Sequence, residues 1–333
     1  MASAHYPPAT VLLTGAAGFI GWETARRLFD RGIRVVGVDN LNDYYDVKLK
    51  LHRLDDLQQY ADFSFHKIDI EDRSALEEVF QKNRIDAVIN LAARAGVRYS
   101  VENPYVYIST NVQGTLNLLE LMRNYKIDKL VLASTSSLYA GQQMPFSESL
   151  PVNTPISPYA ASKKAAEAIC YTYHHLFGTD VSILRYFTVY GPAGRPDMSP
   201  FRFIQWISEG NEVAVYGDGS QKRDFTYVTD IAEGTVKALK PVGYEIINLG
   251  NSQPHSLHQL ITLVEDTLGK KARVNYLPFQ KTDMEVTWAD IAKASRLIGW
   301  KPRVTLEEGI KLTIDWHRAN QHWLRHIATD LSK

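Results

Sequence analysis

The sequence predicts an α/β fold, in which a doubly wound parallel sheet is followed by a smaller, mixed α/β C-terminal lobe. Up to Tyr190, short apolar segments rich in β-branched residues alternate with longer helical patterns. Strands that are apolar along their whole length are typical of a parallel sheet that helices cover on both faces. After Tyr190 the alternation becomes irregular, and glycine and proline cluster in Gly191–Pro196. This change indicates a second part of different architecture.

The individual elements follow from this alternation. The apolar segments expected as strands are Thr10–Thr14, Arg34–Asp39, Phe63–Ile70, Ala87–Leu91, Lys129–Ser134 and Val181–Phe187. The helical patterns are Gly21–Arg31, Arg73–Lys82, Val106–Tyr125 and Tyr159–Phe177. Ile246–Leu249 is expected as one more strand of the large sheet. We therefore expect residues 1–187 and about 226–251 to form the larger domain, and residues 188–225 and about 252–333 to form the smaller lobe.

The composition is that of an ordinary globular protein. Lys+Arg and Asp+Glu number 37 each among 333 residues, so the net charge gives no indication of nucleic-acid or anionic-membrane binding. The single cysteine, Cys170, excludes a disulfide framework and leaves too few thiolates for a cysteine-based metal site. Met1–Tyr6 lacks the features of a signal peptide, and the apolar stretches are only strand-length. A cytoplasmic location is therefore expected.

A glycine-rich turn follows the first expected strand directly, in the segment TGAAGFIG. Gly15 permits a tight turn, Gly18 allows the backbone to approach a pyrophosphate, and Gly21 allows the next helix to pack on the strand. The N-terminus of that helix offers free N–H groups and a positive dipole end to phosphates. The turn therefore predicts dinucleotide binding by a Rossmann-type domain.

The ends of the following strands indicate which dinucleotide is bound. Asp39 lies 18 residues after Gly21, where a carboxylate can accept hydrogen bonds from both ribose hydroxyls. A carboxylate there would repel a 2′-phosphate, and Asn40 offers no cation to receive one. NAD is therefore expected rather than NADP. By their position in the fold, further residues would contact the adenine, the phosphates or the ribose: Asp69, Ile70, Leu91, Ala92 and Ala93.

A tyrosine and a lysine stand four positions apart in the segment SPYAASKKAAEA, which has the features of a helix start. This spacing places Tyr159 and Lys163 on one helix face. A phenol has a pKa of about 10, so it needs help to act as a base near neutral pH. A fixed ammonium and an oxidised nicotinamide nearby would favour the phenolate. The glycine turn and the hydroxyl-rich strand end Ser134–Ser137 favour catalysis over the alternative of a surface helix pair.

Over nearly its whole length the chain resembles the extended short-chain dehydrogenases/reductases. The resemblance is carried by TGAAGFIG, DNLNDYYD, NLAARAGVRYS, STSSLY, YAASK, RYFTVYGPAGRPDM and GDGSQKRDFTYVTD. Among these motifs, DNLNDYYD, AGVRYS and the GRPDM segment look specifically like those of UDP-glucuronate 4-epimerases.

The resemblance implies a reaction and its residues. Tyr159 would be the base, Lys163 its electrostatic partner and ribose anchor, and Thr135 the hydroxyl that relays the proton. Proton removal from the sugar 4-hydroxyl would accompany hydride transfer to a tightly held NAD. The 4-keto sugar would then turn, and hydride would return to its opposite face. Further cofactor contacts are implied for Phe19, Ile20, Asn40 and Tyr186.

The residues after Thr135 indicate which reaction of the family takes place. Related dehydratases carry an Asp-Glu pair there, and related decarboxylases carry a Glu two residues on. Here these positions hold Ser136 and Ser137, which cannot act as carboxylate bases but can donate hydrogen bonds to a substrate carboxylate. Thr188, where similar neutral-hexose epimerases carry Asn, also suits a carboxylate. Arg195 is expected either to bind that carboxylate or to form a salt bridge within its loop.

The resemblance also implies how the nucleotide is held. Arg223 would pair with the diphosphate, because a guanidinium fork fits phosphate oxygens. The backbone of Val215 and Tyr216 would contact uracil, Asp290 would bind the uridine ribose, and Arg98 would add a second charge near the phosphates.

The expected partners are a UDP-sugar substrate and a second copy of the chain, with no nucleic acid, no membrane and no metal. Apolar residues on the helices Val106–Tyr125 and Tyr159–Phe177 would form a four-helix dimer interface, as the resemblance implies. Two alternatives stay open. The first is an enzyme of the same family with another product, a UDP-glucose or UDP-GlcNAc 4-epimerase or a UDP-glucuronate decarboxylase. The second is a non-catalytic NAD-binding regulator.

Overall fold

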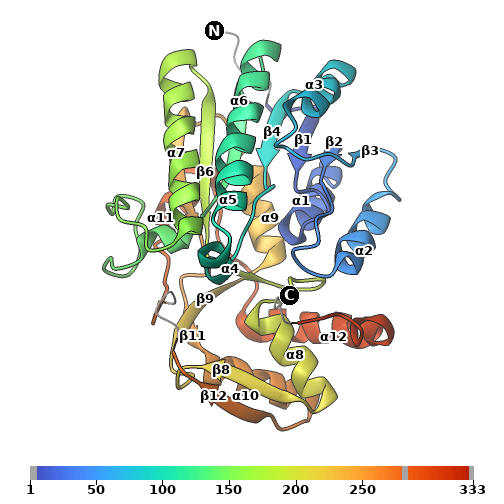
Figure 1. Cartoon of the computed structure of the whole chain (residues 1–333), viewed down its shortest axis with the longest axis vertical. Coiled ribbons are helices and arrows are strands. Elements are labelled where there is room, and N and C mark those ends of the chain that lie inside the picture. Colours follow the sequence, from blue (N-terminus) through green and yellow to red (C-terminus); the bar gives the residue numbers. More distant parts are fainter. Residues whose placement is uncertain (1–5, 280–283, 330–333) are drawn as a thin grey trace.

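A seven-stranded parallel sheet is the centre of the computed structural model, which describes residues 6–279 and 284–329 (Figure 1). The strands lie in the order β10-β6-β5-β4-β1-β2-β3, and every neighbouring pair is parallel. Their bounds are β1 Thr10–Thr14, β2 Arg34–Val38, β3 Phe63–His66, β4 Ala87–Asn90, β5 Lys129–Thr135, β6 Asp180–Tyr186 and β10 Tyr244–Leu249. The order reverses between β1 and β4, which is the switch point of a doubly wound sheet. The predicted fold class is confirmed.

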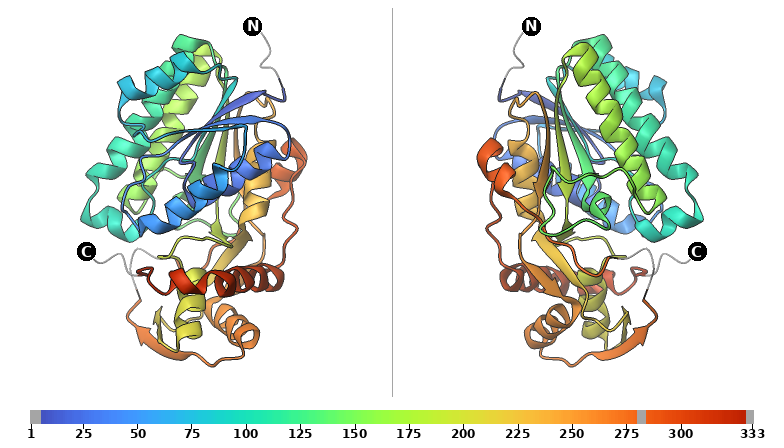
Figure 2. Two further views of the ribbon diagram at one scale, coloured as in Figure 1. Left: turned by 90° about the vertical axis from the view of Figure 1, so that its right-hand side faces the viewer. Right: turned by 90° about the vertical axis from the view of Figure 1, so that its left-hand side faces the viewer.

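Helices cover both faces of this sheet (Figure 2). One face packs against α1 Phe19–Phe29, α9 Val228–Lys237 and α11 Ala292–Ile298, and the other against α3 Arg73–Lys82, α6 Gly114–Tyr125 and α7 Pro158–Phe177. Successive strand residues alternate between the two cores, so Val11 and Leu13 belong to the first and Leu12 to the second. Because both faces are buried, all three positions are apolar, which is why the strands could be located from the sequence.

Local capping sets the beginning of α7. Ser157 accepts a hydrogen bond from the N–H of Ala160 at 3.2 Å, and Pro158 occupies the first turn, where its missing N–H costs nothing. The helix ends at Gly178, whose φ of +73° is strained for other residues. Tyr159 is thereby placed in the first turn of the helix.

The predicted helix Val106–Tyr125 is not one regular helix. The structure divides it into α5 Tyr105–Tyr107, a π-helix Ile108–Gln113 and α6 Gly114–Tyr125. A π-helix adds a residue per turn and re-aims the side chains around it. The helical periodicity of the sequence does not reveal this insertion.

The smaller lobe lies beyond the carboxyl ends of the large sheet (Figure 1). It contains a three-stranded sheet of β7 Thr188–Tyr190, β9 Lys222–Tyr227 and β11 Pro254–Ser256, and a two-stranded sheet of β8 Glu212–Tyr216 and β12 Arg273–Leu277. Its helices are α8 Ser199–Glu209, α10 Leu257–Leu268 and α12 Leu306–Leu324. These elements share a separate apolar core.

The predicted domain boundaries remain a prediction, and their outermost residues 1–5 and 330–333 lie outside the described residues. Strand β10 does join the large sheet beside β6, as expected for Ile246–Leu249. In the part of the chain that the structure describes, no helix combines the length and apolarity that crossing a membrane requires. The cytoplasmic location expected from the sequence also remains a prediction.

A histidine is buried between α8 and α12. His317 is 3% exposed, its ring lies 6.5 Å from that of Phe201, and neither ring nitrogen has a hydrogen-bond partner among the described residues. Burial lowers the pKa of His317 to about 4, because the apolar surroundings cannot solvate the imidazolium.

Replacing His317 with Phe should remove a pH-dependent part of the stability. Because the folded pKa lies below the ordinary value of about 6.5, the unfolded chain binds an extra proton between these two pH values. The stability of the parent protein should therefore fall from pH 6.5 toward pH 4, by up to about 3 kcal/mol for this group. Urea unfolding at several pH values measures it, with the exposed His322→Gln as control. Parallel curves for His317→Phe and parent would contradict the prediction.

Candidate active site

A cavity of about 910 Å³ opens at the carboxyl ends of the large sheet, against the smaller lobe. It lies at the switch point between β1 and β4, where ligands bind in doubly wound folds. Among the residues predicted for cofactor, catalysis and substrate, all line it except Gly18 and Asp290. The structure therefore brings together residues from nearly the whole length of the chain.

The glycine turn forms one wall of the cavity. Gly15 has a φ of +70°, and a Cβ on it would lie 2.8 Å from the backbone nitrogen of Ala92. A Cβ on Gly21 would lie 2.0 Å from the carbonyl oxygen of Gly15, so any side chain would push α1 off β1. Gly18 caps α1 without a side chain to accept its N–H groups. The first turn of α1 is thus available to an anion.

Two carboxylates mark the ends of β2 and β3. Asp39 is 7% exposed and accepts a hydrogen bond from the N–H of Leu41 at 2.8 Å. Asn40 lines the cavity, but its amide is already committed, because Nδ2 donates to Asp69 Oδ2 at 2.6 Å. Asn40 therefore holds the loops after β2 and β3 together.

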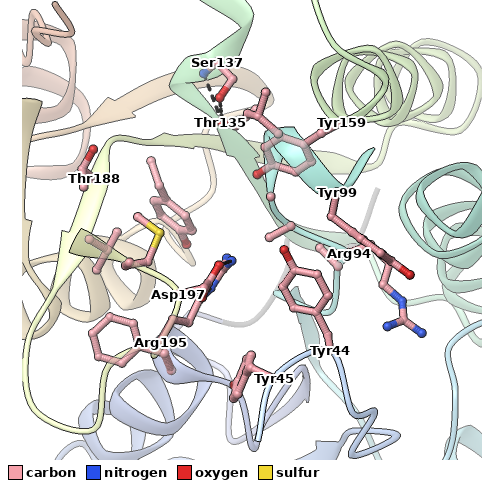
Figure 3. A pocket seen from close by; sticks show the side chains of 18 of the residues that line it. Tyr44, Tyr45, Arg94, Tyr99, Thr135, Ser137, Tyr159, Thr188, Arg195 and Asp197 are labelled. Atoms are coloured by element: carbon pink, nitrogen blue, oxygen red, sulfur yellow. Dashed lines mark hydrogen bonds and ion pairs between the residues drawn. The ribbon is translucent and has the colours of Figure 1, made fainter. Parts of the chain in front are cut away.

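Tyr159, Thr135 and Lys163 all line this cavity, and Figure 3 shows Tyr159 beside Thr135. Burial raises the pKa of Tyr159, while a hydrogen bond with the Thr135 hydroxyl and the charge of Arg195 lower it. Lys163 Nζ donates to the carbonyl of Ala133 at 2.9 Å. Burial lowers the pKa of Lys163 to about 8. The backbone thus engages one N–H of the Lys163 ammonium, and its electrostatic support of a Tyr159 phenolate remains a prediction.

Hydroxyl groups gather beside Tyr159. Thr135 Oγ1 donates to Ser137 Oγ at 3.1 Å and accepts from the Ser137 N–H at 3.1 Å. Ser136 begins the short 3₁₀ turn Ser136–Tyr139 and also lines the cavity. Thr188, in β7, approaches the same space from another side (Figure 3).

Arg195 forms an ion pair within its own loop. Its Nε and Nη2 lie 3.0 and 2.5 Å from the two oxygens of Asp197, and its guanidinium lies 5.6 Å from the ring centre of Tyr44. Of the two alternatives stated for Arg195, the salt bridge is the one present. The pair still lines the cavity, so its cation stays close to the space beside Tyr159.

The residues predicted to bind the nucleotide lie where the two lobes contact each other. The guanidinium of Arg98, in α4 Val97–Glu102, lies 4.2 Å from the ring centre of Tyr216 in β8. Arg223 donates to the carbonyl of Lys222 at 2.9 Å. The Tyr216 carbonyl accepts a hydrogen bond from Gln221, and the predicted contact of the Val215 and Tyr216 backbone with uracil remains a prediction.

Asp290 does not reach the cavity. Its Oδ1 accepts from the N–H of Ala292 at 2.9 Å, and its own N–H donates to the carbonyl of Phe146 at 3.0 Å. These bonds hold a turn just before α11. The placement gives no support to the predicted ribose contact, because the carboxylate is engaged by its own loop.

Asn111 is a site residue that the sequence did not reveal. It is 2% exposed in the π-helix, and its Nδ2 donates to the carbonyl of Arg94 at 3.0 Å and to Ser162 Oγ at 2.9 Å. Ser162 Oγ in turn donates to the carbonyl of Tyr159 at 2.8 Å. Asn111 therefore connects the loop after β4 to the helix of Tyr159. No local motif marks it, because only the π-helix directs it there.

A buried ion pair lies one turn beyond Lys163. Glu167 accepts from Arg185 Nε at 2.9 Å, from Arg185 Nη2 at 2.7 Å and from Ser134 Oγ at 2.6 Å. Both charged side chains are 1% exposed. This pair ties α7 to β5 and β6 directly beneath the predicted catalytic residues.

Comparisons with known proteins give consistent matches. The family model described as GDP-mannose 4,6 dehydratase matches residues 12–313. A UDP-glucuronate 4-epimerase of Thermodesulfobacterium geofontis (strain OPF15) is 57% identical over 317 residues, covering 95% of this chain and 98% of that protein. The crystal structure of UDP-glucuronic acid 4-epimerase from Bacillus cereus with UDP-glucuronic acid and NAD has a TM-score of 0.88 and 38% identity, covering 93% of this chain and 99% of that one. A UDP-glucose 4-epimerase from Thermotoga maritima with UDP-glucose has a TM-score of 0.86 and 32% identity, covering 94% and 99%.

Proposed function

Because the chain belongs to the extended short-chain dehydrogenase/reductase family that the GDP-mannose 4,6 dehydratase model describes, we propose that it interconverts UDP-glucuronate and UDP-galacturonate with NAD. The observation that carries the proposal is one cavity with the glycine turn and Asp39 at one end and Tyr159 beside Thr135 further along. The 57% identity to a UDP-glucuronate 4-epimerase supports this sugar.

The residues present fit NAD. The open first turn of α1 suits the diphosphate, Asp39 suits the ribose hydroxyls, and the small side chains of Ala92 and Ala93 leave room for the backbone of the cofactor. Bound NAD supplies a hydride acceptor and donor, and a positively charged ring. We propose that Lys163 anchors the adjoining ribose from its place at Ala133.

Tyr159 Oη is proposed to take the proton of the sugar 4-hydroxyl, with Thr135 Oγ1 as relay, and to return it after the sugar has turned. Burial opposes the phenolate, so cations must offset it. Arg195 already lowers the pKa of Tyr159. The positive ring of the oxidised cofactor would lower it further, which couples proton removal to the oxidised state.

The proposal also explains why elimination and decarboxylation do not follow. Ser136 and Ser137 supply hydroxyls where a dehydratase or decarboxylase would need a carboxylate base. A 4-keto uronate is a β-keto acid, which loses carbon dioxide when its carboxylate bond aligns with the ketone π system. We propose that Ser136, Ser137 and Thr188 hold the carboxylate out of that alignment.

Tyr159→Phe should lower the epimerisation rate by at least about 100-fold, because the proton acceptor is lost. The amount of NAD bound per chain should stay unchanged. The assay incubates purified protein with UDP-glucuronate and separates UDP-galacturonate from UDP-pentoses. The exposed Tyr171→Phe, on the same helix, is the control. Parent protein that converts only UDP-glucose would contradict the proposed substrate, and an active Tyr159→Phe would contradict the proposed base.

Thr188→Val should raise the fraction of UDP-pentose among the products, because one hydrogen bond to the carboxylate is lost while the volume is kept. The measurement is the pentose-to-hexuronate ratio at equal conversion. Thr172→Val, at an exposed position of α7, should leave the ratio unchanged. An unaltered pentose-to-hexuronate ratio in Thr188→Val would show that Thr188 does not hold the carboxylate.

We propose a homodimer that pairs the α5–α6 region and α7 with their copies. The structure leaves large apolar side chains exposed on these helices: Tyr105, Ile108, Leu116, Tyr171, Leu176 and Phe177. Since α6 and α7 lie side by side on the same face of the sheet, their exposed residues can form one continuous surface (Figure 1). Contiguous apolar surface of this kind marks interaction sites.

The variant Leu116→Lys with Tyr171→Lys should sediment as a monomer, because it places buried charges in the proposed interface. Sedimentation velocity compares it with the parent. Leu312→Lys, which alters a 41% exposed leucine on α12, should leave the parent's association unchanged. A parent protein that is monomeric at micromolar concentration would refute the dimer.

A further inference from the structure

A buried lysine of the cavity has no role in the chemistry described above. Lys50, in α2 Val47–Leu57, is 5% exposed and lines the cavity. Its Nζ lies 5.1 Å from the ring centre of Tyr45, and no described residue accepts a hydrogen bond from it. An ammonium that is this buried and lacks an acceptor is unfavourable unless an anion compensates it.

The charged groups around Lys50 indicate which kind of ligand this site would bind. Asp39, at the end of β2, is the anion that acts on it, whereas Arg53, Arg94 and Arg195 are cations. The pKa of Lys50 is lowered to about 8, mainly by burial; Asp39 opposes this shift, and the three cations add to it. Arg195 is already paired with Asp197, so Lys50, Arg53 and Arg94 stand against Asp39, which leaves an excess of positive charge. A site with this excess favours a ligand that carries negative charge.

Arg53 fixes the position of Lys50 relative to the glycine turn. It lies three residues further along α2 and is completely buried. Its Nη1 donates to the carbonyl of Ala17 at 3.1 Å, and its Nη2 donates to the carbonyl of Ala193 at 2.6 Å. Arg53 therefore attaches this face of α2 to the glycine turn, which precedes α1. Residues three apart share a helix face, so Lys50 is held over the same part of the cavity.

We propose that Lys50 is a further cofactor-binding residue, whose ammonium binds a phosphate oxygen of the dinucleotide on the adenosine side, next to Asp39. A phosphate oxygen suits this position because an ammonium can only donate, and its strongest acceptors are anionic. The glycine turn supplies N–H groups to the diphosphate but no full charge, which Lys50 adds. This inference rests on the proposed function, because it requires a dinucleotide in the cavity.

The test uses the protein with its cofactor bound. Lys50→Met removes the charge and keeps the length of the apolar stem, and Lys48→Met changes an exposed lysine of the same helix. Exchange of bound NAD for labelled NAD measures retention independently of turnover. We expect Lys50→Met to exchange at least about tenfold faster than the parent, since a charge-assisted hydrogen bond is lost. Lys48→Met should exchange at the parent rate.

Two competitors locate the contact on the cofactor. ADP-ribose carries the diphosphate and adenosine does not. ADP-ribose should displace labelled NAD from the parent much better than adenosine does, and most of this difference should be lost in Lys50→Met. If Lys50→Met lowers the affinity for ADP-ribose and for adenosine equally, the ammonium binds the ribose and the phosphate assignment is wrong. If Lys50→Met exchanges NAD like the parent, the inference fails.

The remaining controls separate this inference from the proposed function. Lys50→Arg should keep exchange within about threefold of the parent, since the cation remains. Thermal unfolding checks that each variant folds. If Lys50→Met does not fold, Lys50→Gln replaces it. Exchange of NAD by Lys50→Gln at the parent rate would then overturn the inference. Parent protein that binds no NAD contradicts the proposed function itself, whereas parent-like retention by the Lys50 variants contradicts the Lys50 assignment alone.

Discussion

The buried ion pair of Glu167 with Arg185 fixes the helix that carries Tyr159 and Lys163 to the centre of the sheet. Glu167 binds Arg185 in β6 through both oxygens and also accepts from Ser134 in β5. A buried pair of this kind adds little net stability compared with apolar packing, but losing one partner leaves an uncompensated charge. Any sliding of α7 along the sheet would separate the charges. The position of Tyr159 relative to the cavity therefore depends on this contact.

The site consists of segments that are far apart in the sequence and come together only when the sheet forms. The glycine turn after β1, the loop after β4 and the helix of Tyr159 come together only at the switch point of strand order. Asn111 holds two of these segments, since it binds the backbone of Arg94 and the hydroxyl of Ser162. Arg53 does the same for α2 and the glycine turn. Buried polar side chains thus connect these segments through hydrogen bonds to backbone groups and hydroxyls.

Burial and charge act in opposite directions at the reacting centre. Burial disfavours a Tyr159 phenolate, whereas the hydrogen bond with Thr135 and the charge of Arg195 favour it. Lys163 is engaged by Ala133 and Arg195 by Asp197, so neither cation is committed to the phenol alone. In the proposed reaction, the positive ring of bound NAD would be the further charge that offsets the cost of burying the phenolate. The proposal assigns the hydroxyls of Ser136, Ser137 and Thr188 to the carboxylate of the sugar.

The sequence by itself determined the elements whose signal is local. The seven strands of the large sheet follow from runs of apolar residues, and the glycine turn follows from its residue types. The structure has these elements with shifts of a few residues at their ends. The tertiary structure decided which groups are partners. It turned Lys163 to Ala133 and paired Arg195 with Asp197. It also kept Asp290 in a turn and brought Lys50 into the cavity. The reason is physical: a periodicity describes neighbours along the chain, whereas a side chain bonds to whatever donor or acceptor the packed fold places within about 3 Å of it.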